Sequence, residues 1–455
     1  MTTMTPKPTQ LSGAKFLASH AYALLADLPR VGKTGSTIIA SDYVMAETIL
    51  VVTTASGRGV WKRGFPAWSA YDRPVQVMMG GTKLDPKIPS AIVSWNGMST
   101  PSLRVELLKR KWDLIIPDEV HAAKSFGAKR TQALYGTLVD DGAVLNKTSA
   151  LTNTTERMWP LSGTPLPNSP ADAYPMLRAL FRERLTTDFG PTDVTVQSKF
   201  IDRYCRMRPM KIGHGYMSRY IDVFVEGRNL EELNARIAGI FLQRTQRDVG
   251  ILEPDYETMP LIAPKALPPE LRDQKRGTQI LEAARTGDRA SLEMHMGPLR
   301  RLTGEIKAGL VVEAITEELD GALDKVVIAY WHKDVGKILL DGFAKYGVTG
   351  IDGSTSAKLR TANEQRFLND KKCRVFLAQI QAAGEAIDLS SASNLIFAES
   401  SFVPKDMAQM AMRICNHTQA TKPLVRVATL EGSIDDALQS ILLRKWSAIR
   451  EVLKS

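Results

Sequence analysis

Short apolar runs recur along both halves of the chain and set the expected fold. They lie at 48–53, 91–95, 113–117, 325–330, 375–379 and 394–398. Each run is rich in β-branched residues, too short for a helix and too continuous for a half-exposed strand. In the first half, a turn and a helix-length amphipathic stretch follow each run. The pattern therefore predicts buried parallel strands that alternate with helices, which is an α/β fold.

The strand signal fades between these two regions. Residues 167–240 are polar and rich in arginine, which predicts a helical insertion in or after the first lobe. Five prolines between 254 and 269 mark a linker over 252–275, and a helical stretch is expected over 270–296. The expected parts are an N-terminal lobe over 1–251, a linker and helical connection over 252–300, and a C-terminal lobe over 301–455.

Composition and charge narrow the functional classes. The chain has 455 residues, which at roughly 150 residues per domain suits two or three globular units. Lys and Arg number 59 against 49 Asp and Glu, and the net charge of +10 favours a polyanionic partner. Cys205, Cys373 and Cys415 are widely separated and odd in number, which argues against a disulfide framework and a CxxC metal site. No apolar stretch of about 18 residues occurs, so we expect a cytoplasmic protein with no membrane contact.

Residues 21–39 have the pattern of a phosphate-binding loop, with an apolar run, a turn, and Gly32, Lys33 and Thr34 opening a helix. Backbone N–H groups at a helix start bind phosphate oxygens, a lysine reaches the terminal phosphates, and a hydroxyl group binds Mg²⁺. Asp27 stands where the pattern GxxxxGK[ST] has its first glycine. The segment predicts a site for ATP and Mg²⁺.

Two carboxylates follow the strand expected at 113–117. They are Asp118 and Glu119. P-loop ATPases hold Mg²⁺ with a carboxylate at the end of a parallel strand beside the phosphate loop, and a second carboxylate there can polarise the attacking water. Asp118 is therefore a candidate metal ligand together with Thr34, and Glu119 is the candidate catalytic base.

These motifs resemble those of the superfamily-two helicases, and most of all the Swi/Snf-type DNA-dependent ATPases, including small phage or bacterial members. ADLPRVGKT at 26–34 is similar to motif I of that family, with Arg30 where a glycine is usual. DEVH at 118–121 is similar to a DEAH-like motif II, and Gln10 matches the upstream glutamine that contacts adenine. FLQRTQRDV at 241–249 resembles the basic segment that ends the first lobe. The resemblance covers most of the chain and implies two RecA-like lobes with ATP held between them.

Two further motifs fit the same resemblance. LSGTPLPNS is close to motif III, in which Ser162, Gly163 and Thr164 link the ATP site to DNA. QAAGEAIDLSSASNLIFAE looks like motif V, with Gly384 and Asp388 near nucleotide and DNA.

The last motif departs from the family at one position. DMAQMAMRICNHTQ at 406–419 matches the motif VI pattern QxxxRxxRxGQ at Gln409, Arg413 and Gln419. Asn416 replaces the second arginine, so the resemblance leaves Arg413 as the one catalytic arginine finger. An arginine finger can be worth roughly 10³-fold or more in rate, and its loss predicts slow turnover. Two nearby side chains are candidates to replace it: Arg426 and His417.

Candidate DNA contacts follow the strands of the first lobe. After the first strand, small polar residues precede Arg58, Lys62 and Arg63, which suit phosphate oxygens. SWNGM follows the next strand, as motif Ib does in the family, and contributes Ser94 and Asn96. Tryptophans near these segments are expected in the core. They are Trp61, Trp68 and Trp95.

The insertion adds a second cationic cluster, formed by Arg203, Arg206, Arg208 and Lys211. In the family such protrusions lie over the duplex, so Arg203 and Arg206 are further candidate DNA contacts. The spacings of zinc fingers, homeodomains and basic zippers are absent from the sequence. Binding is therefore expected to be sequence-independent and directed at the DNA backbone.

The resemblance implies an ATP-dependent DNA helicase or translocase that acts in replication, repair or recombination, with replication proteins as possible partners. Strand unwinding, duplex translocation and annealing stay open, because no strand-separating element is evident. Two alternatives remain. One is an ATP-gated DNA clamp with little or no turnover, which Asn416 favours and the intact Lys33, Asp118 and Glu119 disfavour. The other is an RNA helicase of the same superfamily.

Overall fold

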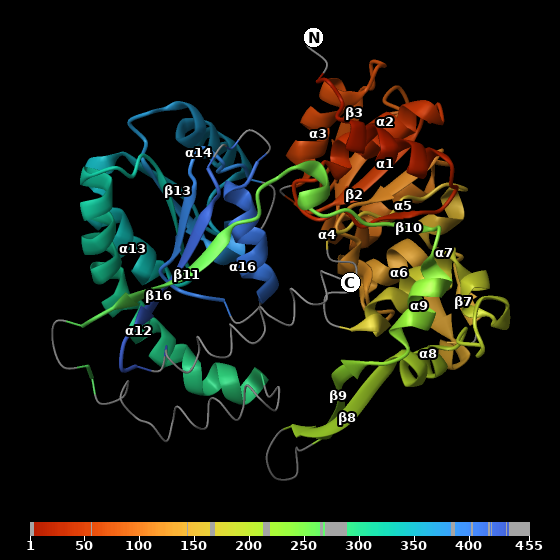
Figure 1. Ribbon diagram of the computed structural model, residues 1–455. Helices are drawn as coiled ribbons and strands as arrows, with labels where there is room; N and C mark the ends of the chain where they lie inside the picture. The colour runs from red at the N-terminus through yellow and green to blue at the C-terminus, as the bar shows by residue number, and fades with distance from the viewer. Residues whose placement is uncertain are drawn as a thin grey trace. The chain divides into compact units, whose positions relative to one another are not determined.

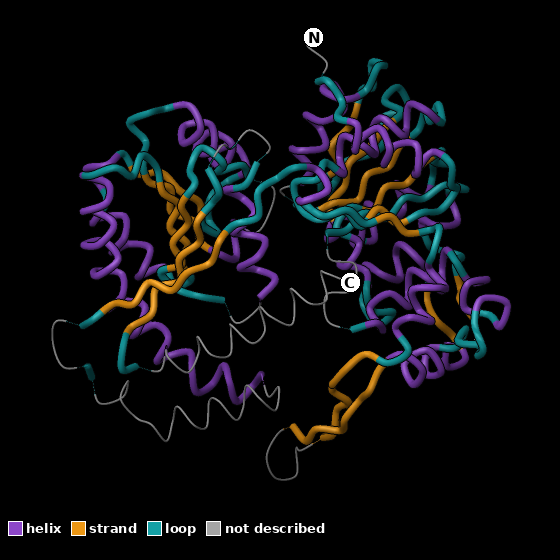
Figure 2. Tube along the Cα trace, viewed as in Figure 1, coloured by secondary structure: helices purple, strands orange, loops and turns teal. Residues whose placement is uncertain are grey.

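The chain is described here by a computed structural model (Figure 1). The residues that it describes are 4–55, 57–142, 144–163, 169–212, 219–263, 267–268, 289–383, 387–401, 404–416, 419, 421–433 and 435. The chain forms two compact units, Met1–Val249 and Gly250–Ser455. Each unit is built around its own parallel sheet, as the strands in Figure 2 show.

The first unit centres on a parallel sheet with the strand order β3-β4-β2-β5. Its strands are β2 (Ile49–Thr53), β3 (Val75–Met78), β4 (Ser90–Ser94) and β5 (Leu114–Pro117). Three of the four are the strands expected from the apolar runs, and β3 is the addition. The residues of β2 and β5 are buried throughout, which explains why their sequences are continuously apolar.

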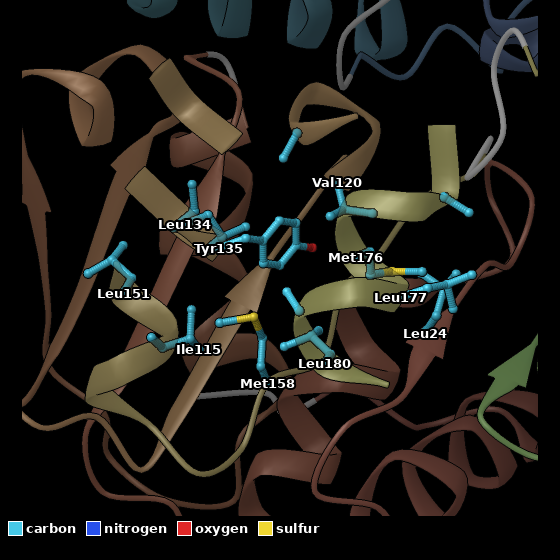
Figure 3. Packing of buried hydrophobic residues seen from close by; sticks show 14 of the residues in the cluster. Leu24, Ile115, Val120, Leu134, Tyr135, Leu151, Met158, Met176, Leu177 and Leu180 are labelled. Atoms are coloured by element: carbon cyan, nitrogen blue, oxygen red, sulfur yellow. The ribbon is translucent and has the colours of Figure 1, made fainter. Parts of the chain in front are cut away.

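Two apolar layers cover the two faces of this sheet. Ile49 and Val51 pack with α1 (Pro8–Ala18), α2 (Lys33–Tyr43) and α3 (Gly57–Trp68). Leu50 and Val52 pack on the opposite face. Helices of that second layer are α4 (Trp95–Ser99), α5 (Pro101–Leu108), α6 (Lys129–Tyr135) and α7 (Tyr174–Leu180). In Figure 3, Ile115, Met158 and Leu180 lie on one side of the buried ring of Tyr135 in this layer.

An extended segment, residues 157–162, joins the sheet to β1 (Leu24–Leu25), which itself pairs with β10 (Phe241–Leu242) in parallel. On one side, Leu161 N–H donates to Pro117 O at 2.8 Å. On the other side, Ser162 N–H donates to Leu25 O at 3.1 Å. The carboxyl ends of β1 and β5 therefore lie on either side of this segment, and the residues after both strands are brought to one edge.

The insertion is not wholly helical, contrary to the sequence prediction. It contains α8 (Gln197–Tyr204) and α9 (Leu230–Ile237). Between them, β8 (Cys205–Ile212) and β9 (Arg219–Gly227) form an antiparallel ribbon that projects from its unit (Figure 1). The β9 sequence RYIDVFVEG is rich in β-branched and aromatic residues, and this strand signal outweighs the arginine content.

The second unit has a six-stranded parallel sheet with the order β11-β16-β15-β12-β14-β13. The expected runs form β12 (Val326–Tyr330), β14 (Val375–Gln379) and β15 (Asn394–Phe397). The other strands are β11 (Asp255–Leu261), β13 (Val348–Ile351) and β16 (Leu424–Leu430). Its described helices are α12 (Arg289–Asp320), α13 (Lys333–Gly342), α14 (Ala357–Asn369), α15 (Ile380–Ala383) and α16 (Pro404–Ala411).

The prediction of a linker over 252–275 is wrong in its first part. Residues 255–261 form β11, which pairs with β16 along its whole length. Pro260 is tolerated because β11 is an edge strand, whose outer side needs no N–H donor. The helical stretch expected over 270–296 lies outside the described residues up to 288, and α12 begins at Arg289. Among the helices that the structure describes, none combines the length and hydropathy required to cross a lipid bilayer.

Candidate nucleotide site

The loop between β1 and α2, residues 26–32, has the geometry of a phosphate-binding loop. Gly32 caps α2 with a φ of 108°, a conformation that glycine adopts without strain. The helix then begins at Lys33, as the sequence predicts. The Lys33 ammonium group donates to the carbonyl oxygens of Asp27 at 2.6 Å and Leu28 at 3.4 Å. The loop thus places the lysine beside the amino end of α2, where phosphate oxygens bind.

Arg30 occupies a strained position in this loop. Its φ is 72°, which is the left-handed region. In that region a Cβ atom approaches the following carbonyl oxygen, at a cost of roughly 1–2 kcal/mol for most residues. This conformation explains why the related motif has glycine at the position, and Arg30 keeps it in spite of the strain.

Asp27, which replaces the usual first glycine of the loop, is fully buried and forms an ion pair with Arg244. The Arg244 Nε donates to Asp27 Oδ1 at 2.9 Å, and Nη2 contacts Oδ2. Arg244 also donates to Ser12 Oγ at 2.9 Å and to Thr9 O, which lie on α1. Nearby, Gln246 Nε2 donates to Pro29 O at 3.0 Å. The basic segment 241–249 therefore fixes the shape of the phosphate loop through contacts with Asp27 and Pro29.

Gln10 and motif III lie against the same loop. A Cβ atom added to Gly32 would come within 2.9 Å of Gln10 Nε2, and one added to Gly35 within 2.6 Å. Gln10 Oε1 accepts a hydrogen bond from Lys7 N–H at 3.0 Å, so this side chain also caps α1. A Cβ atom on Gly163 would lie 3.6 Å from Lys33 Nζ. The structure thus brings the adenine candidate, the loop and motif III together.

Asp118 follows β5, and three side chains hold it in place. Thr53 Oγ1 donates to Asp118 Oδ2 at 2.9 Å, and Trp61 Nε1 donates to the same oxygen at 2.8 Å. Trp95 Nε1 donates to the main-chain oxygen of Asp118 at 2.9 Å. Trp61 and Trp95 are buried, as the sequence predicts, and Trp68 is partly buried against the apolar layer that contains Trp61.

Opposing effects act on the pKa of the Asp118 carboxyl group. Burial raises the pKa of its carboxyl group above the usual range, and the negative charge of Glu119 raises it further. The hydrogen bonds from Trp61 and Thr53, and the positive charge of Lys33, lower this pKa and partly offset the rise. A cation bound at this carboxylate would favour its ionised form in the same way that Lys33 does.

The donor set fits Mg²⁺. Thr53 and Trp61 both donate to Oδ2 of Asp118, and Thr34 adds a hydroxyl group at the start of α2. Mg²⁺ prefers oxygen ligands and is usually held by one or two carboxylates together with phosphates and water. Among the described residues, no cluster of three or more His, Cys, Asp or Glu side chains is suited to holding a metal ion.

Glu119 and His121 connect the carboxylates to motif III. Glu119 has a φ of 54°, a left-handed conformation that turns the chain sharply after Asp118. His121 Nδ1 lies 3.1 Å from Glu119 Oε2 and 3.3 Å from Ser162 Oγ. Ser162 is fully buried, so it is placed to link motifs II and III, and direct DNA contact by its side chain is not possible in this conformation. Thr164 lies outside the described residues.

In the second unit, motifs V and VI are joined to each other. Leu389 N–H donates to Arg413 O at 3.0 Å, and Asp388 N–H donates to Glu364 Oε1 at 2.9 Å. Gln409 is half-buried on α16, and Arg413 follows it in a short 3₁₀ turn. Gly384 lies outside the described residues.

Asn416, at the position of the missing arginine, is directed at motif V. Its Nδ2 donates to Ser390 Oγ at 2.6 Å, and its main-chain N–H donates to Gln419 Oε1 at 3.1 Å. Arg426 cannot easily replace the lost arginine, because two of its nitrogens bind the Glu318 carboxylate at 2.5 and 2.7 Å. His417 lies outside the described residues.

The cations expected after β2 lie on α3. Lys62 and Arg63 are exposed, whereas Arg58 is half-buried and donates to Ala55 O at 3.1 Å. After β4, Ser94 caps α4 by accepting a hydrogen bond from Gly97 N–H at 3.1 Å, and Asn96 is exposed. The Ser94 hydroxyl group therefore has a local structural role in addition to its expected one.

The Arg203 side chain, predicted to contact DNA, is instead held in an ion pair within the first unit. Its Nε and Nη2 bind Glu232 Oε2 at 2.9 and 2.5 Å, in a network with Tyr204 and Arg236. The charge of Arg203 is thereby neutralised on the body of the insertion. Arg206 pairs across the ribbon with Glu226 at 2.8 Å, but both side chains are 54% exposed, so a phosphate can compete for this arginine.

Sequence reasoning missed the residues that support the site. Thr53, Trp61 and Arg244 hold Asp118 and Asp27, yet each looks like ordinary core or surface sequence. The one available sequence signal is that the N–H group of a buried tryptophan needs a hydrogen-bond acceptor. This signal does not show which residue the acceptor is.

Replacing Asp118 with asparagine should stabilise the protein in metal-free buffer. The folded-state pKa of Asp118 is raised, so the folded protein is less stable above this pKa than it would be with a neutral side chain. The stability gain of Asp118→Asn should therefore grow as the pH rises through the window between the unfolded-state and folded-state pKa values. Thermal denaturation in EDTA at several pH values measures it, and an equal or lower melting temperature at every pH would contradict the account.

Arg30→Gly should also stabilise the protein, because glycine removes the left-handed strain. The gain is reduced by the greater freedom of glycine in the unfolded chain, which leaves an expected net increase of about 0.5 kcal/mol in the free energy of unfolding. Urea denaturation measures this quantity. Arg30→Ala is the matched control, since it removes the same side chain but keeps the Cβ atom, and it should show no such gain. Equal effects of the two changes would locate the strain elsewhere.

Comparison with known proteins agrees with this geometry. Residues 310–417 match the family model of the helicase conserved C-terminal domain. The chain is 26% identical over 98% of its length to a SWI/SNF-related matrix-associated actin-dependent regulator of chromatin subfamily A-like protein 1 of Xenopus tropicalis. It is 25% identical over 96% of its length to the mouse DNA annealing helicase and endonuclease ZRANB3. It spans 44% and 40% of these two relatives, so less than half of each.

Among solved structures, the chain is similar to the SWI2/SNF2 ATPase core of Sulfolobus solfataricus in complex with dsDNA. The TM-score is 0.45 and the sequence identity is 18%, and the match covers 99% of this chain and 93% of that chain. The similarity to the two relatives runs through both units, and the match to the C-terminal helicase domain includes motifs V and VI up to His417. Residues 310–417 thus match the helicase conserved C-terminal domain, and the chain as a whole is similar to SWI/SNF-related proteins and to a DNA annealing helicase.

Proposed function

We propose that this chain is an ATP-dependent DNA translocase or helicase, which couples ATP hydrolysis to movement on DNA. The observation that carries the proposal is the single edge of the first sheet where the phosphate loop, Asp118, Glu119 and motif III converge. The relatives point to the nucleic acid, since the name of one is a DNA annealing helicase. We further propose that the protein acts in the cytoplasm and comes from a phage or a bacterium. Its process would be DNA replication, repair or recombination, with replication proteins as partners.

Each residue of the site has a distinct task in this proposal. The N–H groups at the start of α2 and the ammonium group of Lys33 bind phosphate oxygens. Thr34 and Asp118 hold Mg²⁺, which neutralises charge on the phosphates when it is bound. Glu119 accepts the proton of the attacking water, and His121 orients Glu119 while contacting Ser162.

The remaining assignments are carried over from the family motifs. Gln10 contacts the adenine base, and in the second unit Gly384, Asp388 and Gln409 contact the nucleotide. Arg413 stabilises the charge that develops on the transferred phosphoryl group.

DNA binding is proposed on exposed side chains of the first unit. Lys62 and Arg63 on α3 and Asn96 on α4 contact backbone phosphates, with Arg206 on the ribbon as a further contact. The ribbon region from Arg203 to Arg228 has six Lys or Arg against two acidic residues, a net charge of +4. Contacts of this kind carry no base information, so binding is sequence-independent and weakens steeply with salt.

Asn416 supports a second candidate, a DNA clamp that binds ATP but turns it over slowly or not at all. Its amide group is held by Ser390, and no arginine stands at this position of motif VI. The intact Lys33, Asp118 and Glu119 weigh against this candidate, since a clamp that only binds ATP does not need a catalytic base.

ATP hydrolysis measured without nucleic acid, and with single-stranded DNA, duplex DNA, forked DNA or RNA, separates the candidates. We expect strong stimulation by duplex or forked DNA, and Lys33→Ala should lose hydrolysis while its affinity for DNA changes less than about two-fold, because Lys33 serves the phosphates alone. Stimulation by RNA only would favour the RNA helicase. Absence of hydrolysis in every reaction, with ATP still bound, would favour the clamp.

Restoring the missing arginine is a separate test of motif VI. Asn416→Arg should raise the turnover number, by roughly ten-fold or more if the new guanidinium group reaches the phosphates. Asn416→Ala is the control, because it breaks the same hydrogen bond to Ser390 without adding charge. If the two variants have equal turnover numbers, position 416 does not act on the phosphates.

A further inference from the structure

Two buried tryptophans reach the same carboxylate residue from two different helices. The Trp61 indole N–H donates to the side chain of Asp118 at 2.8 Å, and the Trp95 indole N–H donates to its main-chain oxygen at 2.9 Å. Trp61 is 1% exposed and Trp95 is 4% exposed. Neither ring can stack on a base, so both act on the interior of the first unit.

The two helices also carry the exposed residues of the proposed DNA surface. On α3, Trp61 is followed directly by Lys62 and Arg63, both exposed. On α4, Trp95 is followed directly by Asn96, which is exposed. A rigid helix turns as one body, so a shift imposed on its exposed side is passed to the buried tryptophan. On each helix, a proposed DNA contact and a tryptophan that binds Asp118 therefore lie within one turn of each other.

The hydrogen bonds of Trp61 and Thr53 meet at one oxygen atom, Asp118 Oδ2. Two donors on one oxygen fix the plane of the carboxylate and the direction of the other oxygen. Thr53 ends β2, whereas Trp61 lies on α3. A small rotation of α3 against the sheet thus changes one donor and leaves the other in place.

Other tryptophans of the first unit show what a purely structural partner looks like. Trp112 Nε1 donates to Leu107 O at 3.0 Å, and Trp159 Nε1 donates to His20 O at 3.0 Å. Both satisfy a buried N–H with the main-chain carbonyl of a residue outside the candidate nucleotide site, whereas the carbonyl that Trp95 uses belongs to Asp118. Trp61 donates to an ionisable side chain in the candidate nucleotide site, which a structural role does not require.

We propose that Trp61 and Trp95 are positioning residues that transmit DNA contact at α3 and α4 to Asp118, and so make ATP turnover depend on DNA. This inference rests on the proposed function and deepens it. DNA bound at Lys62, Arg63 and Asn96 fixes the positions of α3 and α4. The two helices fix the positions of the indole N–H groups, and these orient Asp118, which holds the metal.

The test replaces single donors while keeping their volume. Trp61→Phe keeps an aromatic ring and loses the N–H, whereas Trp112→Phe loses a buried N–H that does not contact Asp118. Thr53→Val removes the other donor to Oδ2 without altering a DNA-contact helix. Loss of a residue that orients a metal ligand typically costs 10–100-fold in metal affinity or activity.

For Trp61→Phe, we expect the ratio of DNA-stimulated to basal ATP hydrolysis to fall by roughly ten-fold, with the Kd for duplex DNA within about two-fold of wild type. Thr53→Val should lower both rates by the same factor and keep the ratio. The rise in melting temperature on adding Mg²⁺ and ADP, which is a binding readout, should shrink in both variants and not in Trp112→Phe. Trp95→Phe should lower the same ratio and carries the test if Trp61→Phe does not fold.

Two results would overturn the coupling. In one, Trp61→Phe and Trp95→Phe keep the wild-type ratio, as Trp112→Phe should. In the other, Trp61→Phe lowers both rates equally, as expected of Thr53→Val, so that Trp61 serves the metal site alone. Failure of the proposed function gives a different result, because the wild-type chain itself would then hydrolyse no ATP or show no response to DNA.

Discussion

The candidate site depends on the hydrogen bonds of one extended segment, residues 157–162. Through Leu161 and Ser162 this segment binds the ends of both β1 and β5. The phosphate loop follows β1 and Asp118 follows β5, so these few main-chain hydrogen bonds set the position of the lysine relative to the carboxylates. The same segment ends in motif III, whose Ser162 and Gly163 then lie beside His121 and Lys33. One strand pairing thus assembles three motifs that lie far apart in the sequence.

Several features of the candidate site lower the stability of the protein in the absence of ligands. Asp118 has a raised pKa because burial and Glu119 disfavour its charge, and Arg30 and Glu119 both have left-handed backbone conformations. Such strain persists only where the surroundings impose it. Here the surroundings are the Arg244 ion pair behind the loop and the indole and hydroxyl donors at Asp118. A cation held at Asp118 would favour the ionised form of this carboxyl group, and would therefore link the stability of this region to ligand binding.

Much of the fold and part of the site follow from the sequence. Fully buried parallel strands have a distinctive pattern, so β2, β4, β5, β12, β14 and β15 were predictable. Short or edge strands such as β3 and β11 were missed, because half-polar residues and a proline hide them. The sequence predicts helix for the β8–β9 ribbon because the arginines of β8 suit either structure, and the strand signal lies in β9.

At the site, local chemistry was predictable and long-range partners were not. Gly32, Lys33 and Asp118 are recognised because backbone geometry and phosphate chemistry demand those residue types in that order. Arg244 and Asp27 are 217 positions apart, and their pairing emerges only when β10 lies beside β1. The prediction of Arg203 as a DNA contact rests on a cationic cluster and on the family resemblance, and Glu232, which neutralises this arginine, comes from another helix.

The central claim is that ATP turnover at this sheet edge drives movement along DNA, and displacement of a third strand from a duplex tests it most directly. A triplex-forming strand has no base pairs that a stationary enzyme must open, so its release reports passage of the protein along the duplex. We predict that the wild-type chain releases the third strand in the presence of ATP and Mg²⁺ and not with a non-hydrolysable ATP analogue. ATP hydrolysis that is stimulated by the duplex while the third strand stays bound would contradict the account.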